Sequence, residues 1–190
     1  MERKKRLILD HETRMARELA LLVFDKPKPH LWMILLPIFF VFFAQKMKQY
    51  TKGLEDFTGN YMKSRRRALD AAFEAEGAGT PVDWNELLEG ARIPDEARPL
   101  YTEWMGHLID HYRLLLSSSG STLAELVRAG YASKTNYLLF CNCLHKAENA
   151  FAQALLPAMQ GDDGDLRHII AKMQAAADDL GRRDADTFFP

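Results

Sequence analysis

The sequence predicts an all-α protein: a helical bundle preceded by a basic N-terminal arm that carries a short, proline-interrupted hydrophobic helix. Three observations predict this class. Apolar residues recur at helical spacing in several segments, no segment alternates strictly as a half-buried strand does, and one apolar stretch occupies residues 31–44. We divide the chain into the arm over residues 1–76, the bundle over residues 80–181 and a loose tail over residues 182–190.

The first helix is predicted over residues 3–24, because its apolar residues share one side. These are Ile8, Met15, Leu19 and Leu22. The segment DKPKPH ends this helix, since closely spaced prolines permit no regular helix. After the apolar stretch, residues 46–76 read as helix again, with Gly53 and Gly59 as points where it can break.

The bundle is predicted to contain five further helices. They cover roughly residues 80–88, 94–116, 122–130, 133–159 and 165–180. Pro81 suits the first helical position, where its missing amide hydrogen is not needed. Thr122 and Glu125 fit a capping box, and Ser133 can cap the helix that follows.

Charge is distributed unevenly along the 190 residues, although the formal net charge is only -1. Residues 1–67 contain 15 of the 25 Lys and Arg but 7 of the 26 Asp and Glu, so this part carries +8 and the remainder -9. Such a split predicts that the basic part meets an anionic partner. Because the apolar stretch lies in the same part, anionic membrane lipid is favoured over nucleic acid.

The apolar stretch over residues 31–44 is compatible with a membrane span, a re-entrant helix, an interfacial helix or a buried one. As a helix its 14 residues measure roughly 21 Å, which is short against a hydrocarbon core of about 30 Å. Basic residues flank both ends, whereas a single span concentrates them at its cytoplasmic end. We therefore expect both ends on the cytoplasmic side, with Pro37 kinking the helix near its midpoint.

The residues expected to insert are Trp32, Leu35, Pro37, Phe39, Phe40, Phe42 and Phe43. Those expected to contact lipid head groups are Lys28, Lys46, Lys48, Arg65, Arg66 and Arg67. The competing interpretation buries the stretch in a soluble core or an oligomer interface. Packing into a larger membrane complex would give the same sequence pattern.

A second candidate site rests on histidines and a glutamate at helical spacing. His107 and His111 lie four residues apart and share a helix face, while His145 and Glu148 lie three apart on another predicted helix. If the two helices face each other, these four side chains could hold a metal ion. The full ligand pattern of a di-iron bundle is missing. The alternative interpretation is that these four residues are ordinary polar residues on helix surfaces.

Other site types find little support in the sequence. The segment LAELVRAGYASKTNYLLF has the layout of a helix–turn–helix with Gly130 in the turn, but its second helix is apolar and its surroundings are acidic. A DNA reader needs a basic face there, so a corner of the bundle is the better interpretation. Cys141 and Cys143 are spaced for packing instead of redox chemistry. We see no glycine-rich phosphate loop and no nucleophile elbow, and we expect no cofactor.

Together these features predict a non-catalytic, membrane-associated adaptor or accessory subunit at the cytoplasmic face of a membrane. Its acidic bundle would dock a protein partner or a larger membrane complex. Two alternatives remain open. One is a metal-binding enzyme or redox subunit built on the histidines, and the other is a soluble interaction domain that buries the apolar stretch.

Overall fold

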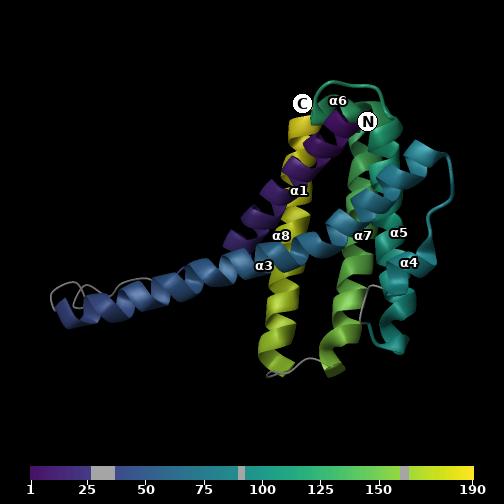
Figure 1. Cartoon of the computed structure of the whole chain (residues 1–190). Helices are drawn as coiled ribbons and strands as arrows, with labels where there is room; N and C mark the ends of the chain where they lie inside the picture. Colours follow the sequence, from purple (N-terminus) through teal and green to yellow (C-terminus); the bar gives the residue numbers. More distant parts are fainter. Residues whose placement is uncertain (27–36, 90–92, 159–162) are drawn as a thin grey trace.

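Figure 1 shows the computed structural model of the chain, which describes residues 1–26, 37–89, 93–158 and 163–190. For residues 37–46, 158 and 163 it describes the backbone alone. The described residues form seven α-helices packed as a bundle and no strand, so the predicted all-α class is confirmed. In chain order the elements are α1 (Glu2–Val23), α3 (Pro37–Ala78), α4 (Trp84–Glu89), the 3-10 turn η1 (Asp95–Ala97), α5 (Arg98–Ser117), α6 (Leu123–Tyr131), α7 (Lys134–Leu155), the 3-10 turn η2 (Leu156–Ala158) and α8 (Asp163–Phe188).

Five long helices close into a ring. α3 contacts α1 and α5, α7 contacts α5 and α8, and α8 in turn contacts α1. Figure 1 shows α5, α7 and α8 side by side, with α1 and α3 crossing them and α6 at the end where both chain termini lie. The core of the ring is densely apolar, and Leu108, Ile109, Tyr112 and Leu115 of α5 are all at most 2% exposed.

The predicted arm over residues 1–76 is not separate from the bundle where the structure describes it. Ile8 of α1 and Leu69 of α3 belong to the same buried cluster as residues of α5 and α7. A second cluster joins Leu19 of α1 to three apolar residues of α8. The apolar residues that share one side of α1, and those of the second half of α3, pack against the rest of the bundle.

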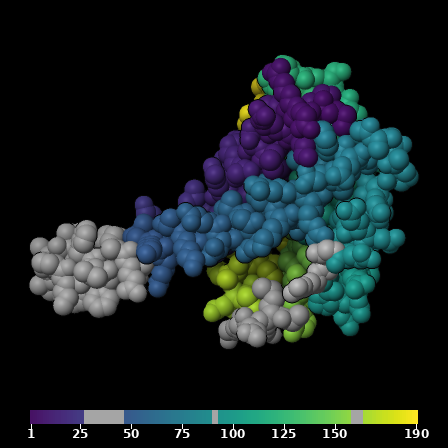
Figure 2. Space-filling view, viewed as in Figure 1, coloured from purple at the N-terminus to yellow at the C-terminus, as the bar shows by residue number. Residues whose placement is uncertain are grey.

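The helix α3 is a single element of 42 residues, about 63 Å long at 1.5 Å per residue. It continues through Gly53 and Gly59, where the sequence allowed breaks. Each glycine costs about 1 kcal/mol relative to alanine, and the packing of Phe57 and Tyr61 against α1 and α8 offsets that cost. Figures 1 and 2 show α1 and α3 lying against each other, with the first part of α3 projecting beyond the end of α1 and away from the bundle.

Residues 182–190, predicted to be loose, continue the last helix, because α8 runs to Phe188. Ala185 and Phe188 are buried in the main core, and the Arg128 guanidinium donates to the Phe188 carbonyl at 2.8 Å. The prediction was wrong because charged residues dominate the composition of this segment. One apolar side chain per turn is nevertheless enough to hold the helix end against α6 and α7.

Two predicted helix starts are confirmed by their hydrogen bonds. The Thr122 hydroxyl accepts from the Glu125 amide at 3.3 Å, and the Glu125 carboxylate accepts from the Ser121 amide at 2.7 Å. At the start of α7, the Ser133 hydroxyl accepts from the Asn136 amide at 3.2 Å. These side chains satisfy amides that have no partner within their helices.

The short helix α4 begins later than predicted. Thr80 and Pro81 precede it, and its first residue is Trp84. The Asp83 carboxylate accepts from the Asn85 amide at 2.9 Å. Asp83 therefore caps this helix, whereas the sequence predicted its start at Thr80 and Pro81.

We expect Gly130→Ala to lower the free energy of unfolding by about 1–3 kcal/mol, because it overpacks a helix contact. A Cβ atom at Gly130 would lie 2.9 Å from Leu114 Cγ and 3.0 Å from Ser118 Oγ, where α6 meets α5. Urea denaturation measures the change. Gly59→Ala is the matched control, since a Cβ there meets nothing within 4 Å. Equal effects of the two substitutions would contradict the prediction.

Candidate functional site

The predicted membrane insert falls partly outside the described residues, which do not include Lys28, Trp32 and Leu35. Pro37 is the first residue of α3 as described. The first two turns of this helix contain the four predicted inserting phenylalanines, Phe39, Phe40, Phe42 and Phe43. Among the helices that the structure describes, none combines the length and the apolar character needed to cross a membrane.

The predicted head-group contacts divide between the surface and the interior. Lys48 and Arg66 are exposed on α3, and Lys46 belongs to the residues described by their backbone alone. Arg67 donates to a backbone carbonyl of α4 at 3.2 Å. Arg65 is 5% exposed inside the bundle, so its predicted lipid contact is wrong. Consecutive residues turn by about 100° around a helix, and three adjacent arginines therefore cannot share one face.

Arg65 is the centre of a buried ionic cluster, which we define as Glu12, Tyr61, Arg65 and Glu148. Its guanidinium donates to the Glu12 carboxylate at 3.1 Å and to the Glu148 carboxylate at 3.3 Å. It also donates to the Tyr61 hydroxyl and lies 4.4 Å from the centroid of that ring. The cluster joins α1, α3 and α7 at one point inside the ring of helices.

Glu12 and Arg65 of the buried ionic cluster are charged at neutral pH. Burial by itself raises the pKa of the Glu12 carboxyl, but the Arg65 guanidinium beside it brings that pKa below its usual value. Burial raises the pKa of the Tyr61 hydroxyl, which therefore remains protonated. Two carboxylates thus share one guanidinium away from water, an arrangement in which loss of the cation leaves uncompensated buried charge.

Glu12 was missed at the sequence level, although a signal for it was present. It continues the apolar stripe of α1 between Ile8 and Ala16, at intervals of four residues, and is 8% exposed. A carboxylate at a core-facing position needs a partner. That partner is Arg65, which lies 53 residues away along the chain, and only the packing of α1 on α3 shows this.

His111, predicted as a metal ligand, belongs to an aromatic cluster. Its ring stacks on Phe140 with the centroids 4.3 Å apart, and its Nδ1 lies 2.6 Å from the Tyr131 hydroxyl oxygen. Burial lowers the pKa of His111 to about 3. The imidazole is therefore neutral at physiological pH and is held by ring stacking and one hydrogen bond.

The other predicted metal ligands have different neighbours. His145 Nδ1 lies 2.7 Å from a carboxylate oxygen of Asp178 on α8. Glu148 belongs to the buried ionic cluster, and His107 is half-buried on α5. In the part of the chain that the structure describes, no three His, Cys, Asp or Glu side chains are grouped to hold a metal ion. The predicted metal site is therefore not supported, because spacing along a helix fixes a shared face but not what lies opposite it.

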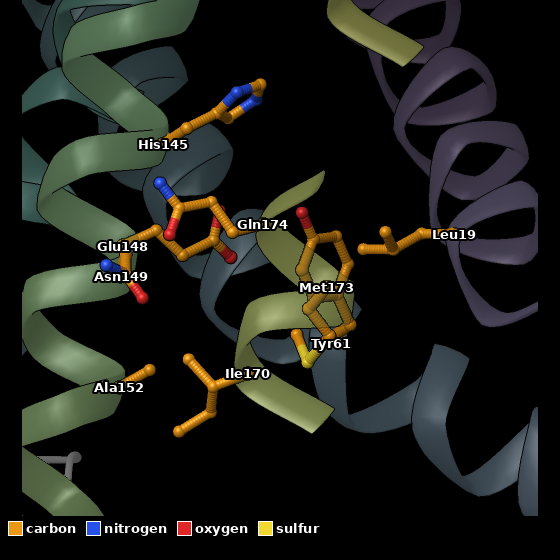
Figure 3. Close-up of a pocket in the computed structure, with 9 residues that line it drawn as sticks. All are labelled: Leu19, Tyr61, His145, Glu148, Asn149, Ala152, Ile170, Met173 and Gln174. Carbon is orange, nitrogen blue, oxygen red and sulfur yellow. The ribbon is translucent and has the colours of Figure 1, made fainter. Parts of the chain in front are cut away.

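Two small cavities adjoin the buried ionic cluster. One has a volume of about 40 Å³ and lies between α1, α3, α7 and α8. Figure 3 shows Glu148 and Asn149 of α7 on one side of it, and Tyr61 and Leu19 beside each other on the opposite side. The second, of about 50 Å³, is lined by Arg65 and its neighbours. Sites for small organic molecules measure about 300–1,000 Å³. Both cavities are far below that size.

The thiol of Cys141 lines the second cavity. Burial raises its pKa to about 12, so the nucleophilic thiolate is a negligible fraction at neutral pH. A Cβ atom at Gly181 of α8 would lie 3.5 Å from its sulfur, which shows how closely the two helices pack there. Cys141 thus has the predicted packing role, whereas Cys143 is exposed.

The interactions in the interior of the bundle therefore hold the helices together. Among the described residues, the interior contains no nucleophile and base placed beside a cavity large enough for a substrate. Comparisons with protein-family models, with curated proteins and with solved structures give no match. The features that bear on function are therefore those of this chain itself. Its most distinctive external feature is the projecting start of α3.

Proposed function

We propose that the protein is a non-catalytic, membrane-associated adaptor or accessory subunit. In this proposal, the apolar stretch around the start of α3 enters one leaflet of a membrane. The helical bundle then stands at the cytoplasmic face and docks a protein partner or a larger membrane complex. One observation carries the proposal: the most apolar part of the sequence leads into the end of α3 that projects away from the bundle (Figure 1).

The geometry of α3 supports this arrangement. The helix begins at Pro37, within the apolar stretch, and its later turns pack into the core through Leu69. One continuous helix therefore connects the proposed insert to the bundle. An insert of 14 apolar residues would give about 21 Å of helix, which suits entry into one leaflet better than a full crossing.

The charges that follow the apolar stretch support contact with anionic lipid. Lys48 and Lys52 are exposed on the projecting part of α3. Each cation near an anionic leaflet contributes about 1 kcal/mol to binding. Leu21, at the end of α1 beside this part of α3, is 58% exposed, and an apolar side chain at that position adds to an interfacial surface.

The bundle provides a surface for a protein partner. A groove of about 500 Å³ lies between the last turns of α3 and the α4 region. Carboxylates of Glu74, Asp83 and Glu86 line it, with Val82 and Leu87 among its apolar residues. A surface of this kind favours a partner segment that carries basic and apolar residues.

We expect the double substitution Phe39→Asp with Phe42→Asp to move the full-length protein from the membrane fraction to the soluble fraction. Each aspartate in hydrocarbon costs about 3 kcal/mol, so the two together weaken membrane binding by a factor of roughly 1,000 or more. Fractionation with salt and carbonate washes followed by detergent measures this. The unaltered protein should resist both washes and be released by detergent.

The matched control is Phe39→Leu with Phe42→Leu, which changes the same positions and keeps them apolar. This variant should remain in the membrane fraction. If the folded aspartate variant also stays there, the apolar stretch is not the anchor. If the unaltered protein is soluble throughout, the proposed function is wrong and the stretch belongs to a protein interface.

A further inference from the structure

A second groove runs along the outside of the pair formed by α1 and α3. It measures about 520 Å³, within the range of about 300–1,000 Å³ that is typical of small-molecule sites. Its residues lie on the sides of the two helices that do not face α8. They are Thr13, Arg17, Ala20 and Leu21 of α1 and Thr51, Leu54, Glu55, Thr58, Gly59, Met62 and Arg66 of α3.

Two arginines at this groove have no partner among the described residues. Arg17 and Arg66 are both exposed, and neither forms a hydrogen bond or ion pair with another described residue. Their neighbours behave differently, since Arg65 is paired inside the bundle and Arg14 reaches Glu18 and Asp184, each at 3.9 Å. The lining holds one carboxylate, that of Glu55, so two cations and one anion leave it at +1.

The groove changes character along its length. Leu21 and Leu54 lie at the end nearer to the start of α3, while Arg66 lies 12 residues farther along α3, about 18 Å away. Met62, which lines the groove, is 2% exposed. At Gly59 an added Cβ atom would meet nothing within 4 Å, which leaves open space in the middle of the groove.

From this arrangement we infer that the groove between α1 and α3 binds one anionic phospholipid. The phosphate lies between Arg17, four residues before Leu21 on α1, and Arg66 farther along the groove, because guanidinium groups bind phosphate oxygens through paired N–H donors. One acyl chain follows the open space at Gly59 toward Leu21 and Leu54, and so leads back to the projecting part of α3. The inference rests on the proposed membrane association, which brings the groove close to lipid.

The test is native mass spectrometry of the full-length protein in a neutral detergent, with phosphatidylglycerol added and phosphatidylcholine as the comparison. The expected result is one bound phosphatidylglycerol per chain and at least about a 10-fold preference over phosphatidylcholine, because two cations favour a head group with net negative charge and the choline cation offsets the phosphate charge of phosphatidylcholine. Arg17→Gln with Arg66→Gln should abolish the preference. Arg167→Gln with Arg182→Gln removes two exposed arginines outside the groove and should leave it unchanged.

A second variant tests the path of the acyl chain without changing charge. Gly59→Leu fills the groove and should abolish the bound lipid, while Gly53→Leu adds the same side chain to α3 at a position that does not line the groove. Retention of selective binding in both Gly59→Leu and the double arginine variant would overturn the inference. So would equal competition by inorganic phosphate.

The outcomes separate this inference from the proposed function. In detergent, lipid binding by the groove does not depend on an anchor, so Phe39→Asp with Phe42→Asp should still bind one phosphatidylglycerol. If this variant leaves the membrane fraction but still binds phosphatidylglycerol in detergent, both proposals are supported. If the protein binds the lipid but is soluble in the cell, the lipid site in the groove is supported and the proposed membrane anchor is wrong. If the protein is bound to membranes but does not bind the lipid, the anchor is supported and the lipid site is wrong.

Discussion

Arg65→Met is expected to lower the free energy of unfolding by about 3–5 kcal/mol, the usual cost of removing one partner from a buried ion pair. The substitution keeps much of the side-chain volume but leaves the Glu12 and Glu148 carboxylates without their shared cation. Chemical denaturation monitored by circular dichroism at neutral pH measures the loss. A domain of this size has a total stability of about 5–15 kcal/mol, so the variant stands near the limit of folding.

The neighbouring residue provides the matched control. Arg66→Met removes the same group one position along α3, where the side chain is exposed and pairs with no other residue in the described part of the chain, and it should leave stability nearly unchanged. A combined Arg65→Met, Glu12→Leu and Glu148→Leu variant should recover most of the loss, because apolar replacement of a whole buried ionic group is often neutral or stabilising. If Arg65→Met and Arg66→Met behave alike, the buried ionic cluster does not hold the bundle together.

The position of the buried ionic cluster matters for the proposed function. Arg65 lies on the same helix as the proposed insert, 28 residues after Pro37, and binds carboxylates on α1 and α7. An apolar core tolerates small sliding of helices, whereas charged groups that must pair inside it fix one register. We therefore regard the cluster as the point at which the projecting helix is fixed to the bundle.

Much of the fold could be predicted from sequence because it depends on local chemistry. Helical spacing of apolar residues and the caps at Thr122 and Ser133 act within a few residues, and the structure confirms both caps. The end of α8 depends instead on contacts with other helices. The segment after Leu180 contains many charged residues, and this composition gives no sign of those contacts. Its single apolar residues, such as Phe188, are informative only once the surface that receives them is known.

The candidate sites show the same limit more clearly. The spacing of His107 and His111 correctly places them on one helix. The ring of His111 faces Phe140 and Tyr131, and no second set of ligands faces it from the residues that the structure describes. The prediction of lipid contact treats Arg65 like Arg66 and Arg67, although adjacent helix positions point to different surroundings. Contacts between helices that are far apart in the sequence determine what these side chains bind. Such contacts cannot be identified from a single sequence.

His111 is expected to make the protein sensitive to mild acid. Its pKa is about 3 in the folded protein because of burial, against about 6.5 in an unfolded chain. The unfolded state therefore binds the extra proton first, and stability is lost as the pH falls below about 6.5. At pH 5 the expected loss is about 2 kcal/mol relative to pH 8, with a slope of about 1.4 kcal/mol per pH unit. Denaturation curves between pH 5 and pH 8 measure it.

His111→Gln should flatten this dependence, because glutamine keeps a polar group near the Tyr131 hydroxyl and does not titrate. His107→Gln, at a half-buried position of the same helix, is the control and should keep the slope. Glu12 does not account for the effect: its pKa is lowered in the folded state, so its contribution is lost only below about pH 4.5. An unchanged slope in His111→Gln would mean that the imidazole takes up its proton without unfolding, and that water reaches a ring now stacked on Phe140.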